Sequence, residues 1–211
     1  MFGRPKPYDR QQTLASAEKA RLRGRTKKAI GEYRKVLAQT PGDHLVLGKL
    51  APLLAQRGLA DEAMRSFEAA AEGYHKEGRD QRAIAVYLLA AEHYPHDQSL
   101  WERIAKLQLE RGTRADAVRT LLRGRQKFRR RTKRPIAIAL LRKALSLEAK
   151  NLEVTLDLAR LLGKEGHGDE ALQLIEGALI WVSDDSYRRV RAAQFRLAPT
   201  LETVWHWMRG T

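Results

Sequence analysis

The chain has 211 residues, of which 43% are hydrophobic, and a net charge of +15. It contains no cysteine, which excludes disulfide bonds, thiolate metal sites and cysteine nucleophiles. No stretch approaches the roughly 18 consecutive apolar residues that cross a bilayer, and the first residues lack the apolar run of a signal peptide. The sequence therefore predicts a cytoplasmic protein, and its low glycine and proline content favours helix throughout.

Helices are predicted along nearly the whole chain. Apolar residues recur at spacings of three and four between glycine or proline breaks, which is the period of a helix with one buried face. Residues 1–9 are expected to be flexible. A solenoid is then expected over 10–182, built from the segments 10–41, 43–95, 97–149 and 151–182.

A small residue followed four positions later by a large apolar one recurs six times, at Ala29–Tyr33, Ala63–Phe67, Ala83–Tyr87, Ala117–Leu121, Ala137–Leu141 and Ala171–Ile175. Antiparallel helices approach closely only where a side chain is small, so each alanine marks a predicted crossing point. Five of the alanines follow a glycine by five residues, at Gly24, Gly58, Gly78, Gly112 and Gly166. Glycine readily adopts the left-handed conformation of a tight turn between helices.

The spacing of the crossing alanines alternates between 34 and 20 residues, so the repeating unit has 54 residues and three helices. Ranges 43–95 and 97–149 are full copies. Their middle helices, predicted over 60–77 and 114–131, each close one hairpin and open the next. The repeat degrades after Val182, and residues 183–211 are expected to form capping helices.

The alanine pattern resembles the tetratricopeptide repeat (TPR) family, whose unit carries a small residue, a large residue four later and a closing proline. The resemblance implies an all-α fold, a right-handed solenoid of antiparallel helices. It also implies a non-enzymatic adaptor that binds another protein in a groove, with no cofactor. The asparagines of the family's carboxylate clamp are missing at the matching positions. Four cations remain candidates for contacting acidic side chains in a groove, namely Arg103, Lys106, Arg119 and Arg160.

Two basic runs carry much of the net charge. Residues 19–28 hold six Lys/Arg and residues 117–147 hold eleven, with no acid in either run. Because the two runs lie two repeats apart, they are expected to line one edge of the solenoid as a basic ridge. The ridge comprises Arg21, Arg23, Arg25, Lys27, Arg123, Arg125, Lys127, Arg129, Arg130, Arg131 and Lys133.

The ridge has three interpretations, which the sequence leaves open. It is a solvated face, a surface for an acidic protein segment, or a surface for nucleic acid or an anionic membrane. Phe128 is the one aromatic residue within the second run and is expected in the core, so reading of nucleic-acid sequence is not expected.

Other candidate chemistry is weaker. His93, His96 and Asp97 have a spacing found among metal ligands, but they flank Pro95 and are interpreted as polar turn residues. No catalytic residue or metal site is predicted. The tail around Trp205 and Trp207 is expected to cap the solenoid, with docking on a partner as the alternative.

Overall fold

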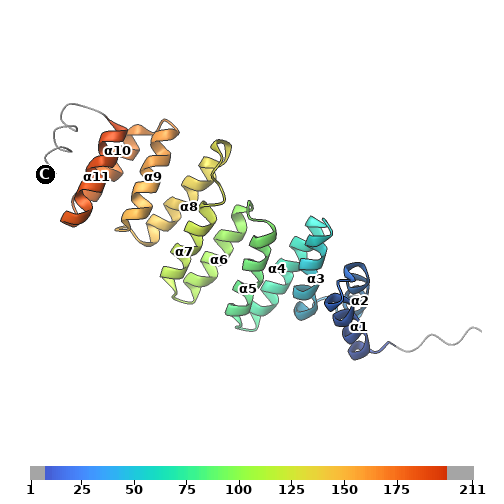
Figure 1. Ribbon diagram of the computed structural model, residues 1–211. Coiled ribbons are helices and arrows are strands. Elements are labelled where there is room, and N and C mark those ends of the chain that lie inside the picture. Colours follow the sequence, from blue (N-terminus) through green and yellow to red (C-terminus); the bar gives the residue numbers. More distant parts are fainter. Residues whose placement is uncertain (1–7, 199–211) are drawn as a thin grey trace, which may run out of the picture. The chain divides into compact units, whose positions relative to one another are not determined.

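The computed structural model describes residues 8–198, which form eleven α-helices, one 3-10 helix and no strand within that range (Figure 1). The chain divides into two compact units, Met1–Leu100 and Trp101–Thr211. No helix between residues 8 and 198 is long and apolar enough to cross a membrane. The segment predicted to be flexible and the Trp205–Trp207 tail lie, apart from residues 8 and 9, outside the described residues.

The first unit is a row of helices in which each helix packs against the next. Their bounds are α1 Arg10–Leu22, α2 Thr26–Gln39, α3 His44–Gln56, α4 Ala60–Lys76 and α5 Asp80–His93. Turns of three or four residues join them, so consecutive helices run antiparallel.

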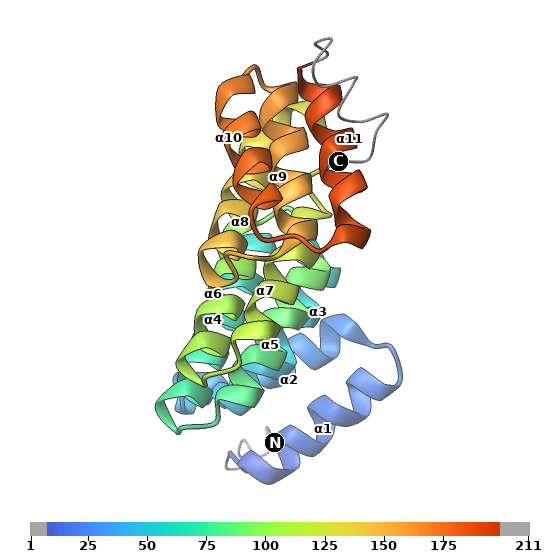
Figure 2. The ribbon, with the colours of Figure 1, turned by 90° about the vertical axis from the view of Figure 1, so that its left-hand side faces the viewer.

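The second unit continues in the same way. It contains most of α6 Gln98–Glu110, followed by α7 Arg114–Arg125, η1 Arg131–Lys133, α8 Arg134–Leu147, α9 Leu152–Lys164, α10 Gly168–Leu179 and α11 Asp184–Leu197. The helices α9, α10 and α11 lie side by side, and α11 contacts both of the others (Figure 2).

The crossing alanines are buried, as predicted. Ala63, Ala83, Ala117 and Ala171 have no exposed surface. The large residues that follow them, such as Phe67 and Leu121, are also in the core. The five turn glycines all adopt positive φ angles, between 67° and 87°, which confirms their predicted role.

Helix bounds recur at an offset of 54 residues. The first residues of α3, α6 and α9 are His44, Gln98 and Leu152, and those of α4, α7 and α10 follow the same offset. Asp43 and Asn151 cap α3 and α9 by accepting a hydrogen bond from the backbone N–H three residues later. Superposition of the full copies stays a prediction.

The predicted length of the second middle helix is wrong. The helix α7 ends at Arg125 rather than near residue 131, whereas its counterpart α4 continues to Lys76. Gly78 closes the turn after α4, but the equivalent position is Thr132, and a β-branched residue disfavours the left-handed conformation. The chain instead leaves the helix early through a loop in which Phe128 is buried.

Candidate binding groove

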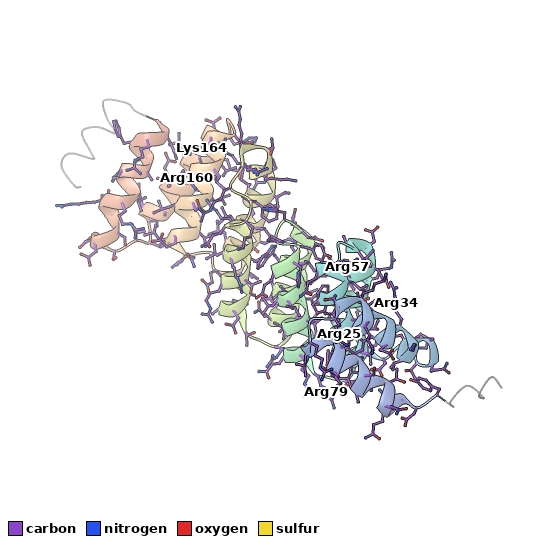
Figure 3. All side chains as sticks on the ribbon, turned by 45° about the vertical axis from the view of Figure 1, so that its right-hand side comes forward. Arg25, Arg34, Arg57, Arg79, Arg160 and Lys164 are labelled. Carbon is purple, nitrogen blue, oxygen red and sulfur yellow. The ribbon has the colours of Figure 1, made fainter. Side chains whose placement is uncertain are left out.

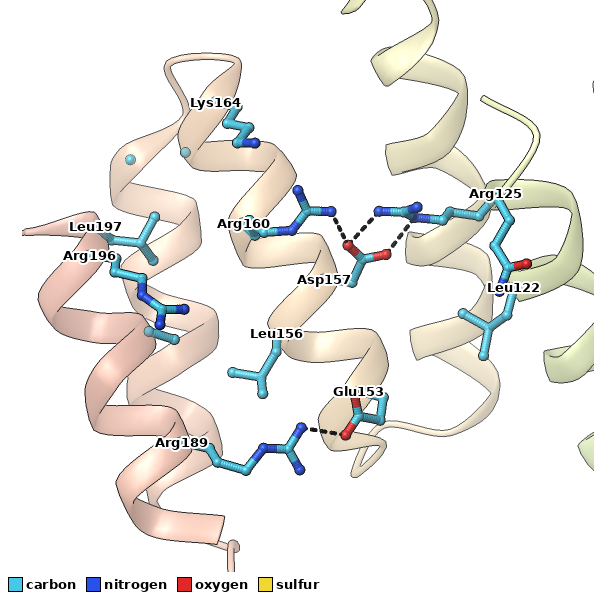
Figure 4. Close-up of a pocket in the computed structure, with 14 residues that line it drawn as sticks. Leu122, Arg125, Glu153, Leu156, Asp157, Arg160, Lys164, Arg189, Arg196 and Leu197 are labelled. Atoms are coloured by element: carbon cyan, nitrogen blue, oxygen red, sulfur yellow. Dashed lines mark hydrogen bonds and ion pairs between the residues drawn. The ribbon is translucent and has the colours of Figure 1, made fainter. Parts of the chain in front are cut away.

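A groove of about 810 Å³ runs across the second unit between α7, α9 and α11 (Figure 4). Its apolar lining comes from one residue or more of each helix. These residues are Leu122, Leu156, Ala193 and Leu197.

Gly163 lets α11 approach α9 closely at one end of this groove. A Cβ atom at Gly163 would lie 2.5 Å from a methyl carbon of Leu197, so only glycine leaves room for that side chain. The close approach places α11 as one wall of the groove, with Leu197 in its lining.

Five cations and two carboxylates also line the groove. Asp157 accepts hydrogen bonds from Arg125 on α7, at 2.5 Å, and from Arg160 on its own helix, at 2.6 Å. Glu153 accepts one from Arg189 on α11, also at 2.5 Å. Both carboxylates are therefore already occupied by arginines of the same unit, as Figure 4 shows.

Lys164 and Arg196 line the same groove without such a partner. No ion pair in the described chain includes either side chain. The groove therefore offers apolar surface together with two cations that have no acid of their own. This combination suits a ligand with both an apolar side chain and a negative charge.

The structure separates the groove residues predicted from the sequence. Arg160 lines the groove. Arg103, Lys106 and Arg119 are exposed on α6 and α7, outside the lining of this groove. Lys106 pairs with Glu110 at 3.8 Å, and Arg119 pairs with an aspartate one turn earlier on its own helix.

The second basic run is also divided. Arg125, predicted to lie on the ridge, points into the groove and pairs with Asp157. Arg123 lies over the ring of Trp101, with its guanidinium carbon 5.9 Å from the ring centroid. The remaining cations of this run are exposed, at Lys127, Arg129, Arg130, Arg131 and Lys133.

The first basic run lies in the first unit. Arg23, Arg25 and Lys27 are exposed. Arg25 and Lys27 border a shallow depression that Arg57 of α3 also lines, and Figure 3 labels Arg25 and Arg57. That this run and the second one share an edge stays a prediction, because the two runs belong to different units.

Arg21 is engaged in a network centred on Glu18, which ties α1 to α2 and α3. The carboxylate accepts hydrogen bonds from Lys49 at 2.6 Å, Tyr33 at 2.8 Å and Arg21 at 2.9 Å. Burial acts to raise the pKa of Glu18, but these three hydrogen bonds outweigh it and lower the pKa to about 2. Arg21 thus shares its charge with an acid, unlike Arg23 or Arg25.

The candidate metal ligands around Pro95 behave as turn residues. Asp97 accepts hydrogen bonds from the backbone N–H and the hydroxyl of Ser99 at the start of α6. Among residues 8–198, no group of three or more His, Cys, Asp or Glu side chains could hold a metal ion.

Residues 137–194, from α8 to α11, match the family model of the tetratricopeptide repeat. The chain contains tetratricopeptide repeats. The family predicted from the crossing alanines is confirmed, and so is the all-α class of antiparallel helices. The matched segment includes α9 and most of α11, two of the three helices that line the groove of this repeat protein.

Several solved repeat structures resemble the chain at low identity. MamA has 17% identity and a TM-score of 0.35, over 81% of this chain and 90% of that one. PilF from Pseudomonas aeruginosa has 18% and 0.31, over 95% and 88%. PilW, a type IV pilus biogenesis factor, has 13% and 0.39, over 95% and 90%. No curated protein matches this repeat protein.

Sequence reasoning missed the contribution of α11 to the groove. Arg189, Ala193 and Arg196 are spaced four and three residues apart, which places them on one face of a helix. That spacing was a usable signal. It was obscured because α11 was interpreted only as a cap, and because Arg191 stands where the repeat has a small residue.

Proposed function

We propose that this protein is a non-enzymatic adaptor that binds a segment of another protein in the groove of the second unit. One observation carries the proposal. Lys164 and Arg196 flank the apolar lining of that groove and have no ion pair within the described chain. Two cations beside apolar surface favour a partner whose complementary groups would meet both at once.

The partner segment is proposed to be amphipathic and acidic. An apolar side chain would cover Leu156 and Leu197, while a carboxylate would contact Lys164 or Arg196. Arg125 and Arg160 contribute less attraction, because Asp157 already accepts hydrogen bonds from both. The partner is therefore expected to discriminate between these two pairs of cations.

The basic ridge is proposed as a second contact for the same class of partner. Its alternative is non-specific binding of nucleic acid or another polyanion, including an anionic membrane surface. That alternative is favoured by one observation, the exposed cations between residues 126 and 134 that have no acid in their own segment.

The groove proposal is tested by capturing partners from lysate with and without nuclease, then mapping the bound segment by cross-linking and mass spectrometry. A synthetic peptide of that segment is titrated against wild type and Lys164→Glu/Arg196→Glu. Affinity is expected to fall at least tenfold, since two attractive contacts become repulsive.

The matched control is Arg65→Glu/Arg114→Glu, which changes the net charge equally at exposed positions outside the groove. The control should keep most of the affinity. Equal losses in both variants would show that overall charge, and not the groove, governs binding. Capture that disappears with nuclease would point to the polyanion alternative.

A further inference from the structure

The connection between α7 and α8 differs from the other turns of the chain. Its counterpart after α4 needs only three residues, Glu77 to Arg79, whereas this one spans residues 126–133 and includes the short helix η1. We call residues 126–133 the basic loop. Extra residues at one position of an otherwise regular array need a physical account, because loop residues cost conformational entropy to order.

The basic loop is held in place at both ends and in the middle. Arg125, just before it, pairs with Asp157 of α9. Arg134, just after it, pairs with Glu165 of the α9–α10 turn at 2.9 Å. Between them Phe128 is buried in the core, with 2% of its surface exposed. Three attachments to the body of the unit therefore fix the conformation of a segment of eight residues.

Between these attachments the loop presents five cations to solvent, Lys127, Arg129, Arg130, Arg131 and Lys133. None of the five forms an ion pair in the described chain, and residues 126–134 include no acid. Exposed arginines elsewhere do have acidic partners. Arg34 pairs with Glu62 and Arg142 with Glu170, each at 2.7 Å.

Five like charges this close repel one another, since they lie within about one Debye length, roughly 8–10 Å. A polyanion relieves that repulsion. It also meets a loop that is already ordered, so little conformational entropy is lost on binding. The attached ends and the unpaired middle together describe a preformed anionic-ligand surface.

We propose that the basic loop binds the sugar–phosphate backbone of double-stranded nucleic acid without reading its base sequence. Three consecutive arginines, 129–131, supply planar donor pairs that match phosphate oxygens. Binding of single strands normally adds base stacking on exposed aromatics, and the one aromatic residue of the loop, Phe128, is buried. The loop also exposes no apolar side chain for insertion into a bilayer.

This surface is distinct from the groove, and the two proposals fail independently. The test is fluorescence anisotropy with a labelled random-sequence duplex at several salt concentrations. Arg129→Ala/Arg130→Ala/Arg131→Ala is compared with Arg34→Ala/Lys35→Ala/Arg142→Ala, a control that removes three exposed, ion-paired cations. Both variants lower the net charge by the same amount.

The loop variant is expected to lose at least tenfold in duplex affinity at low salt. Its slope of log affinity against log salt should become shallower by about 2.7, or about 0.9 for each lost phosphate contact. The control should stay within a few-fold of wild type. Arg129→Lys/Arg130→Lys/Arg131→Lys keeps the charge, so its slope should be unchanged while its affinity falls a few-fold. This variant also serves as the test should the alanine variant fail to fold.

Three results would overturn the proposal. Equal losses in the loop and control variants would mean that net charge alone attracts the duplex. Tighter binding of polyglutamate than of duplex at the same salt would identify an acidic protein segment as the ligand. Flotation with phosphatidylserine vesicles, without measurable duplex binding, would identify a membrane surface.

Discussion

Arg125 reaches from the end of α7 to Asp157 on α9, where its Nη2 lies 2.5 Å from Oδ1 of the carboxylate. The same aspartate accepts a hydrogen bond from Arg160 within the groove. One carboxylate therefore holds the last residue before the basic loop and also neutralises part of the groove lining. Through this contact the two proposed binding surfaces share a structural anchor, although each has its own ligand-facing cations.

Asp157→Asn should destabilise the second unit by about 1–2 kcal/mol, because the Arg125 side chain is only 15% exposed and would lose its charged partner. The loss is kept below that of a fully buried pair by solvent screening. The control is Glu170→Gln, whose partner Arg142 is 53% exposed, and it should cost at most about 0.5 kcal/mol. Urea unfolding measures both variants. Equal losses would contradict the anchoring role of Asp157.

Ala83→Leu should destabilise the fold by about 1–3 kcal/mol, because Ala83 has no exposed surface at a helix crossing and a larger side chain overpacks it. Ala85 lies on the same helix but is exposed, so Ala85→Leu should change the unfolding free energy by about 0.5 kcal/mol or less. Thermal melting of the two variants gives the comparison. An unchanged melt for Ala83→Leu would mean that the crossing register is wrong.

Gly124→Ala should destabilise by about 1–2 kcal/mol even though alanine favours helix. A Cβ atom there would lie 2.6 Å from Cγ of Trp101, which is buried and cannot move away freely. Gly31 is also helical, but nothing lies within 4 Å of its would-be Cβ. Gly31→Ala should therefore stabilise by about 0.5–1 kcal/mol. Denaturant unfolding that shows the same sign for both would contradict this difference in packing.

Glu18→Gln should remove part of the pH dependence of stability in acid. The pKa of Glu18 is lowered from 4.5 to about 2 in the folded chain, so its ionised form is bound more favourably there than in the unfolded chain. The resulting stability is present above about pH 5 and is lost as the pH falls towards 2. At pH 7 the variant should be less stable by about 1–2 kcal/mol, and the difference should shrink towards pH 2. A gap that stays constant from pH 7 to 2.5 would contradict this linkage.

Much of the helical framework was predictable from local sequence. A crossing alanine, a large residue one turn later and a glycine five residues before the alanine are all short-range features. Because packing of neighbouring helices depends on side-chain size at these few positions, the pattern predicted which alanines are buried. It also placed the turns, since the positive φ angles occur at the predicted glycines.

The same local reasoning failed where one signal was missing. No glycine stands at position 132, and the sequence alone did not reveal that α7 would end at Arg125 instead of continuing. Burial of Phe128 decides that path, and burial depends on where the neighbouring helices place their side chains. Ending the helix early is also what brings Arg125 to Asp157 and leaves residues 126–133 as a loop.

By itself, the sequence determined the helix boundaries set by glycines and caps, the buried alanine positions and the excess of positive charge. The tertiary structure alone decided which of those charges remain unpaired. Ion pairing joins residues about 30 positions apart, such as Arg125 with Asp157 and Arg134 with Glu165, and composition cannot specify such contacts. Lys164 and Arg196 stand out only once α11 is packed against α9, because a side chain's partners depend on distances in space and not on spacing along the chain.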